Sequence, residues 1–312
     1  MMSPAHLLPP EWMALLDRLS LGSGKRVAGT LQGKRRSSRL GSSLEFADYR
    51  SYAPGDDVRR FDWGVYSRTG KPFVRQFMDE QELMVSLYVD CSASMDFGGA
   101  PLLDGKPDRN HGENKLLFAK RLAASIGYIA LCSYERVGAY CYSDRLEGRL
   151  PILRGRASAM RLFQFLQEMP PGAEGSLSSA LGDPGAVPRL SGMTWIFSDF
   201  WMDEDESSIG SMLSRLAGAG QEVVLVQVLS PEEIHPELSG DLRLVDSESN
   251  TGKEVAITGR VLQRYREELE HYQNKLRKIT SERGISYVAI SSDMTLQEAV
   301  FGVLAGSGLV RV

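Results

Sequence analysis

The stretch that decides the fold is Leu83-Met84-Val85-Ser86-Leu87-Tyr88-Val89-Asp90, followed directly by Cys91-Ser92-Ala93-Ser94-Met95. Its first eight residues form a nearly continuous apolar run that ends in an aspartate. Such a run is typical of a strand buried on both faces of a parallel sheet. A loop rich in Gly, Pro and Asp follows at 96–112, and the mostly apolar segment 114–134 predicts a long helix.

Strands and helices alternate along the rest of the chain. Further strands are predicted at 136–144, 146–153, 194–200, 222–229 and 285–292, with 146–153 as an antiparallel edge. Helical patterns separate most of them, which favours an α/β fold with a doubly wound, mainly parallel sheet. We therefore expect a sheet domain at 83–312, with a β-hairpin insertion near 241–258. Residues 1–82 are expected to form a separate N-terminal extension, with a short helix, a basic loop and an irregular or β segment.

The bulk composition is that of a globular protein. The 312 residues are 42% hydrophobic and 24% charged, with a formal net charge of −4, which by itself points to neither a nucleic-acid nor a membrane partner. No apolar run is long enough to span a bilayer, and the first twenty residues lack the features of a secretory signal. The three cysteines are too few and too scattered for a disulfide framework. We therefore expect a cytoplasmic protein with no membrane partner.

One charged segment stands apart from this balance. Residues 25–39 hold a Gly- and Ser-containing basic run without an acidic residue, made of Lys25, Arg26, Lys34, Arg35, Arg36 and Arg39. A solvated loop explains the run most simply. The alternative is a contact surface for an acidic partner or for nucleic acid.

Oxygen-bearing side chains gather where the predicted strands end. Asp90, Ser92 and Ser94 occupy alternate positions after the first strand, Ser176 precedes a short helix, and Asp199 ends another strand. Ligands of doubly wound sheets bind beyond the carboxyl ends of the strands. Small hard cations such as Mg²⁺ take oxygen ligands. The alternative interpretation is a set of turn and helix-cap residues, for which Asp and Ser are also favoured.

The spacing resembles the metal-ion-dependent adhesion site of von Willebrand factor A and integrin I-type domains, which reads D-x-S-x-S, then Thr, then Asp. Asp90, Ser92, Ser94 and Asp199 match this pattern, and Ser176 stands where the family has Thr. The resemblance implies that Ser92 and Ser94 ligate Mg²⁺ or Mn²⁺ directly. It further implies that Asp90 and Asp199 act directly or through water, and that Ser176 does so in one state of the site.

Such a centre implies protein binding without catalysis. When few carboxylates touch the ion, its charge is under-neutralised, and an acidic side chain of a partner protein can fill an open coordination position. The rival interpretation is a metal-dependent hydrolase or phosphatase that uses Asp90 and Asp199. Haloacid dehalogenase-type phosphatases need a second Asp two residues after the first, where this chain has Ser92. We therefore do not expect an enzyme.

A second signature lies upstream, at 48–68. It closely resembles the pattern R-x-Y-x-P-G-D-x-x-R-x-I-D-W followed by Arg, the hallmark of the bacterial "domain of unknown function 58" family, with Phe61 in the Ile position. The matching residues are Arg50, Tyr52, Pro54, Gly55, Asp56, Arg59, Asp62, Trp63 and Arg68. The resemblance extends over about residues 40–310. It implies a von Willebrand A-like protein that partners or adapts a MoxR-type AAA+ ATPase.

The charged residues of this signature suggest a structural role. We expect interleaved ion pairs, with Tyr52 and Trp63 as apolar anchors, in a clasp that fastens the N-terminal segment to the sheet domain. The rival interpretation is a partner-binding surface, because Arg, Tyr and Trp are enriched at binding hot spots. Both interpretations concern the same charged residues, which are Arg50, Asp56, Asp57, Arg59, Arg60, Asp62 and Arg68.

Overall fold

Two compact units make up the chain. The computed structural model describes residues 7–22, 46–77, 83–99, 113–172, 175–182, 185–201, 206–238, 240–245 and 252–312. Residues 25–82 belong to a small unit, and residues 1–24 join 83–312 in a larger sheet unit.

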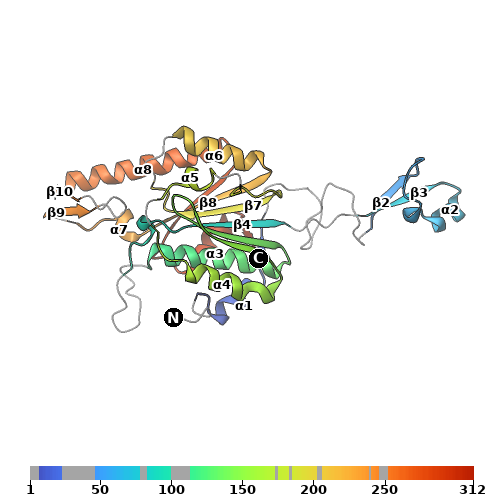
Figure 1. Cartoon of the computed structure of the whole chain (residues 1–312), viewed down its shortest axis with the longest axis horizontal. Coiled ribbons are helices and arrows are strands. Elements are labelled where there is room, and N and C mark those ends of the chain that lie inside the picture. Colours follow the sequence, from blue (N-terminus) through green and yellow to red (C-terminus); the bar gives the residue numbers. More distant parts are fainter. Residues whose placement is uncertain are drawn as a thin grey trace. The chain divides into compact units, whose positions relative to one another are not determined.

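A six-stranded sheet forms the centre of the sheet unit (Figure 1). Its strands are β4 (Met84–Asp90), β5 (Arg136–Tyr142), β6 (Leu146–Arg154), β7 (Gly192–Ser198), β8 (Gln221–Leu229) and β11 (Ser286–Ser291). They lie in the order β11-β8-β7-β4-β5-β6, in which β6 runs antiparallel to β5 and the other neighbours are parallel. When the six strands are numbered along the chain and read from β6 to β11, they follow the doubly wound order 3-2-1-4-5-6. The switch point of this order lies between β4 and β7. The expected α/β fold is confirmed.

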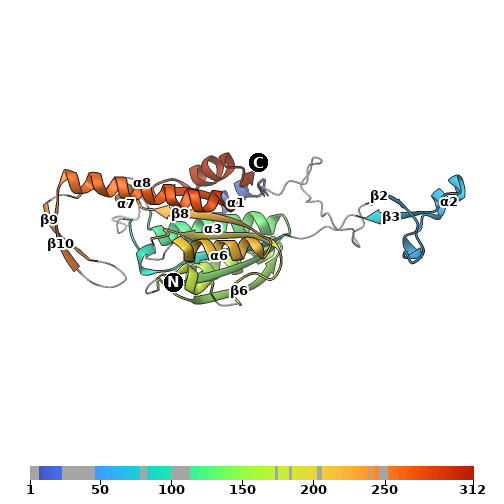
Figure 2. The same cartoon turned by 90° about the horizontal axis from the view of Figure 1, so that it is seen from above.

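Helices cover both faces of the sheet (Figures 1 and 2). One face packs against α3 (Lys115–Cys132), α4 (Ala159–Glu168) and the π-helical turn Glu298–Leu304; the other packs against α5 (Leu177–Ala180), α6 (Glu206–Gly218) and α8 (Gly259–Ser281). Strand β4 is buried along its whole length and contributes side chains to the core on both faces of the sheet. Val85, Leu87 and Val89 belong to the α3 side of the core, and Tyr88 belongs to the α6 side. This alternation follows from the two-residue period of a strand.

The N-terminal segment belongs to the sheet unit, so the expected 1–82 extension is wrong as a single domain. Helix α1 (Pro10–Leu16) packs against α3, and strand β1 (Ser20–Leu21) pairs with the C-terminal strand β12 (Val310–Arg311). Trp12 explains the docking: its indole N–H donates to Ser125 Oγ at 3.1 Å, and its ring meets Phe301 edge-on at 5.8 Å. An amphipathic helix of seven residues gains its stability from such packing.

The expected hairpin insertion is present. Strands β9 (Gly240–Val245) and β10 (Gly252–Ile257) pair antiparallel between the short helix α7 (Pro231–Ile234) and α8. The turn between the two strands lies outside the described residues. Figures 1 and 2 both place the hairpin beside α7 and the first turns of α8.

The small unit is built from few elements. Strand β2 (Phe46–Ser51) pairs antiparallel with β3 (Phe73–Phe77), and between them lie a 3-10 turn (Val58–Arg60) and helix α2 (Trp63–Thr69). The basic run 25–39 lies outside the described residues.

The docking of α1 can be tested with Trp12→Ala. Loss of this buried side chain, which is 8% exposed, should lower the free energy of unfolding by about 3–5 kcal/mol in urea titrations. The matched control is Leu15→Ala on the exposed side of the same helix, where 46% of the residue is exposed. It should change stability by about 0.5 kcal/mol or less. Similar effects of the two variants would contradict the packing of α1 on the sheet unit.

Candidate functional site

Two strand ends meet at the point where the strand order reverses. Asp90 ends β4, and Asp199 follows the last residue of β7. The two strands are parallel neighbours, with Val89 opposite Phe197. Their carboxyl ends therefore lie side by side, at the position where doubly wound sheets hold their ligands.

The Asp90 carboxylate is buried and held by its neighbours. Its Oδ1 accepts from the backbone N–H of Ser92 at 2.9 Å, and its Oδ2 accepts from the Ser198 hydroxyl at 2.6 Å. Burial, together with the negative charge of Asp199, raises the pKa of Asp90 from 3.8 to about 6, although the Ser198 hydrogen bond acts in the opposite direction. The site therefore holds more negative charge than its own hydrogen bonds compensate.

Ser92 and Ser94 are brought together by a 3-10 turn at Ala93–Met95. Their hydroxyl oxygens lie 3.1 Å apart, with Ser92 buried and Ser94 half-buried. An octahedral ion with bonds of 2.0–2.1 Å places adjacent ligands about 3 Å apart. The two hydroxyls therefore fit neighbouring positions around one Mg²⁺ or Mn²⁺ ion.

Ser198, which sequence reasoning did not single out, organises the second strand end. Its hydroxyl donates to Asp90 and accepts from the backbone N–H of Phe200 at 2.8 Å. Phe200 is buried and has a φ of 56°, in the left-handed region that a bulky residue rarely adopts. Backbone strain of this kind concentrates at functional sites. The sequence signal for Ser198 was its place between the buried Phe197 and Asp199.

A buried lysine, also missed by sequence reasoning, contacts Asp199. The Lys115 ammonium lies 2.8 Å from Asp199 Oδ2 and 2.7 Å from Glu233 Oε1, and the lysine side chain is 0% exposed. The other Asp199 oxygen, Oδ1, accepts from the backbone N–H of Trp201 at 3.1 Å. A lysine in the first turn of a mostly apolar helix was the available signal.

Glu233 is fixed as firmly as the lysine. It forms a capping box with Ser230 at the start of α7, and its Oε1 also accepts from the Trp201 indole at 3.2 Å. Its backbone carbonyl accepts from the Tyr265 hydroxyl of α8 at 2.9 Å. The Lys115 ammonium is therefore held between two carboxylates that cannot swing away freely.

Ser176 lies at the same edge, beside the end of β5. Its backbone N–H donates to the carbonyl of Ser143 at 3.1 Å, and its hydroxyl caps α5 by accepting from Ser179 N at 3.2 Å. Gly172, at the start of the same loop, donates its N–H to the carbonyl of Cys91. The loop that carries Ser176 thus approaches the Asp90 turn, while the Ser176 hydroxyl serves as a helix cap.

The donor set is poor in strong ligands. Among the described residues, no group of three or more His, Cys, Asp or Glu side chains is placed to hold a metal ion. The residues that could hold one are instead the two carboxylates Asp90 and Asp199 and the hydroxyls of Ser92, Ser94 and Ser176. Hard cations accept such oxygen ligands and complete their shells with water.

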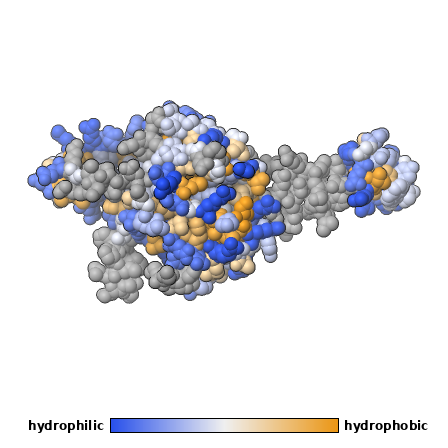
Figure 3. Space-filling view, in the orientation of Figure 1, coloured by the Kyte–Doolittle hydropathy of each residue, from blue (hydrophilic) through white to orange (hydrophobic). Residues whose placement is uncertain are grey.

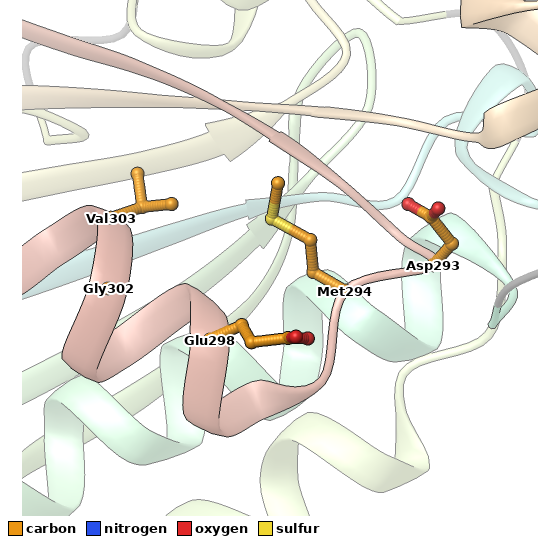
Figure 4. A pocket seen from close by; sticks show the side chains of 5 residues that line it. All are labelled: Asp293, Met294, Glu298, Gly302 and Val303. Carbon is orange, nitrogen blue, oxygen red and sulfur yellow. The ribbon is translucent and has the colours of Figure 1, made fainter.

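A pocket of about 520 Å³ lies elsewhere, at the edge strand β11 (Figure 4). The loop after β11 contributes Asp293 and Met294, and the π-helical turn contributes Glu298, Gly302 and Val303. The Glu298 carboxylate accepts from the backbone and hydroxyl of Thr295, both at 2.8 Å, as a helix-start residue does. None of these five lining residues belongs to the candidate site at the ends of β4 and β7.

The second signature forms local turns in the small unit. Arg50 pairs with Asp56 at 2.6 Å, and Asp57 accepts from the backbone N–H of Arg59 at 3.0 Å. Arg68 donates to the carbonyl of Gly64 within α2 at 3.1 Å. The side chain of Arg60 lies outside the described residues. The structure thus shows one of the expected ion pairs, Arg50–Asp56, whereas Asp57 and Arg68 bind backbone groups.

Asp62 is the centre of the small unit. It caps α2 through the Val65 N–H at 2.9 Å, accepts from Arg75 at 2.6 Å and accepts from the Tyr49 hydroxyl at 3.0 Å. The Arg75 guanidinium and the helix N–H hold the pKa of Asp62 well below its usual range. Arg75 lies outside the signature, and β3 brings it to Asp62.

The aromatic residues of the signature pack together in a partly exposed cluster on the small unit. Phe61 packs against Tyr52, Trp63 and Tyr66, with ring centroids 5.7, 4.5 and 5.5 Å away. Trp63 is nevertheless 63% exposed. Its expected role as an anchor of a clasp to the sheet domain stays a prediction. Figure 3 shows apolar atoms at the surface of the small unit among hydrophilic ones.

Within the part of the chain that the structure describes, no helix combines the length and the apolar character needed to cross a membrane.

The chain is similar to known proteins in sequence and, more distantly, in structure. The uncharacterized protein Mb1516 of Mycobacterium bovis is 32% identical over 256 residues, which are 80% of this chain and 74% of that protein. The conserved hypothetical protein BatB of Bacteroides thetaiotaomicron is 15% identical, with a TM-score of 0.43 over 70% of this chain and 95% of BatB. The SpRpn10 VWA domain is 10% identical, with a TM-score of 0.39 over 71% of this chain and 94% of that domain.

The sequence match decides the family. The family described as "Protein of unknown function DUF58" matches residues 48–278, a range that includes the signature of the small unit, Asp90 and Asp199. This range is well over half of the 312 residues, and a relative of the chain is 32% identical across most of its length. The chain therefore belongs to the DUF58 family.

Proposed function

We propose that the carboxyl edge of the sheet binds Mg²⁺ or Mn²⁺ and presents the ion to an acidic side chain of a partner protein. Ser92 and Ser94 would hold the ion directly, Asp90 and Asp199 directly or through water, and Ser176 in one state of the site. The ion supplies an electrophilic position, and the chain supplies the rigid edge around it. On this proposal the protein is a metal-dependent interaction module and not an enzyme.

The observation that carries the proposal is the pair of hydroxyls 3.1 Å apart, next to a buried carboxylate at the switch point of the sheet. A helix cap or turn needs no second hydroxyl at this distance. If Ser92 served only as a cap of the 3-10 turn, its hydroxyl would be expected to accept from a backbone N–H, as that of Ser176 does, but it forms no such cap bond.

The charge of the site supports a divalent ion. Asp90, Asp199 and Glu233 carry three negative charges when ionised, and Lys115 carries one positive charge, which leaves a balance of −2. Buried charges are costly unless they are paired. A doubly charged cation beside Asp90 and Asp199 would remove this excess.

The bonds of the two carboxylates favour partner binding over hydrolysis. Asp90 and Asp199 each accept hydrogen bonds on both oxygens, and Asp90 is only 4% exposed. A nucleophile must instead reach its substrate. Because the chain's own donors already occupy these oxygens, serine hydroxyls and water would make up much of the ion's shell. Its charge then remains available to a partner carboxylate.

A MoxR-type AAA+ ATPase is the proposed partner, in the cytoplasm, as the resemblance of the second signature implies. The exposed cluster around Trp63 supports a partner surface in the small unit, since tryptophan and arginine are frequent at interface hot spots. The nucleic-acid alternative depends on the run 25–39, outside the described residues. Filter binding in a salt titration would separate the two, because phosphate contacts weaken steeply with salt.

Ion binding is tested by thermal and urea unfolding with Mg²⁺, Mn²⁺ or excess chelator. An ion at 100 times its Kd should stabilise the wild type by about 2.7 kcal/mol. Asp90→Ala should abolish this gain while the domain stays folded. Asp293→Ala, which removes an exposed carboxylate at β11, should keep it. Equal ion effects in all three proteins would sink the proposed site.

The raised pKa of Asp90 predicts a pH dependence in the ion-free protein. The folded state holds this proton more tightly than the unfolded chain, because the pKa is about 6 when folded and near 3.8 when unfolded. The resulting stabilisation is complete below pH 4 and is lost as the pH rises through 6, a change of about 3 kcal/mol.

This dependence is measured as the difference between wild type and Asp90→Asn in chelator, by urea unfolding from pH 4 to pH 7.5. The wild type should lose stability relative to the variant over this range, and saturating Mg²⁺ should remove most of the loss. Parallel pH profiles in chelator would contradict the assignment.

Partner capture completes the test. Immobilised wild type should retain a purified MoxR-type ATPase from the same genome in Mg²⁺, and release it on chelation. Asp90→Ala should retain none under either condition. If the amount of ATPase retained is the same with and without chelator, and the same for wild type and Asp90→Ala, the interface does not use the ion.

A further inference from the structure

The Lys115 ammonium is not required by the proposed metal centre. It is a full positive charge, completely buried, and it binds a carboxylate assigned to the ion. Burying an ammonium group is costly, and a neutral side chain of similar size could fill the same space. Its position therefore calls for an explanation beyond packing.

The surroundings of Lys115 hold the ammonium against Asp199. Glu233 also binds it, at 2.7 Å, and Glu233 is itself anchored by Ser230 and Trp201. The backbone N–H of Lys115 donates to the carbonyl of Phe97 at 2.9 Å, and the Phe97 ring lies 5.8 Å from the ammonium. The loop after the Ser92–Ser94 turn thus also fixes the lysine.

We infer that Lys115 is a built-in counterion that keeps Asp199 from binding the divalent ion directly. The inference rests on the proposed function. The ammonium occupies Asp199 Oδ2, and the Trp201 N–H occupies Oδ1. An ion at Ser92 and Ser94 would then meet Asp199 through water. The ion therefore binds more weakly than it would if Asp199 were free to ligate it. More of the ion's positive charge then remains for the partner's carboxylate. Lys115 is in this sense a positioning residue.

The inference makes an unusual prediction for Lys115→Met, which removes the charge and keeps most of the side-chain volume. Asp199 becomes free to ligate the ion, so the affinity for Mn²⁺ measured by isothermal titration should rise about tenfold, equivalent to about 1.4 kcal/mol. A purely structural role predicts the opposite direction, because damage to the edge can only weaken ion binding. The control is Lys120→Met on the same helix: Lys120 is also buried, but it donates to the carbonyl of Met169 and should leave the affinity unchanged.

A second pair of variants keeps the test decisive if Lys115→Met folds poorly. Loss of one partner of a buried ion pair can cost about 3–5 kcal/mol. The double variant Lys115→Met/Glu233→Gln removes one positive and one negative charge together. It is compared with the single variant Glu233→Gln, which serves as its reference. In the reference, Lys115 still holds Asp199, so the Mn²⁺ affinity should not rise above that of the wild type. The double variant should bind Mn²⁺ about tenfold more tightly than the reference.

The outcomes separate this inference from the proposed function. If the wild type binds no Mn²⁺, the metal centre itself is wrong. If the wild type binds Mn²⁺ but neither Lys115 variant binds it more tightly than its reference, the centre stands and the counterion role of Lys115 is overturned. Tighter Mn²⁺ binding by the variants, with weaker retention of the ATPase, supports the inference in full.

Discussion

The parallel register of β4 and β7 is the constraint on which the rest of the site depends. With Val89 opposite Phe197, each strand ends beside the other, so Asp90 and the Ser198–Asp199 pair emerge at one edge. The strand order reverses here, so one neighbouring connection leads to α3 and the other to α6, on opposite faces of the sheet. Only at such a point does an open edge remain between the two helical layers.

Buried charge is the second constraint, and it links elements that are distant in the chain. Lys115 of α3 joins Asp199 after β7 to Glu233 of α7, and Tyr265 of α8 binds the carbonyl of Glu233. Each of these buried charges needs an oppositely charged neighbour, because an unpaired buried charge would destabilise the fold. The hairpin β9–β10 enters between α7 and α8, so it is attached to the same network.

Sequence patterns predicted the fold well where one physical rule dominates. The apolar run 84–90 became β4, and the predicted antiparallel edge strand and hairpin are both present. The division at residue 82 was wrong for α1, because periodicity shows that a helix has an apolar face but not which element covers it. Trp12 meets Ser125 and Phe301, contacts separated by more than a hundred residues. The local turn roles of Asp57 and Asp62 in the small unit were missed for a similar reason, since charge alone does not distinguish an ion pair from a helix cap.

The sequence by itself determined the α/β fold class, the family and the residues Asp90, Ser92, Ser94 and Asp199 at strand ends, because strand period and motif spacing are local properties of the chain. Tertiary structure alone decided that Ser198 binds Asp90, that Ser176 caps a helix beside β5, and that a buried lysine contacts Asp199. Lys115 is 84 residues from Asp199 and 118 residues from Glu233 in the chain. Only the packing of α3 and α7 against the sheet edge brings these charges within bonding distance, and no local pattern encodes that distance.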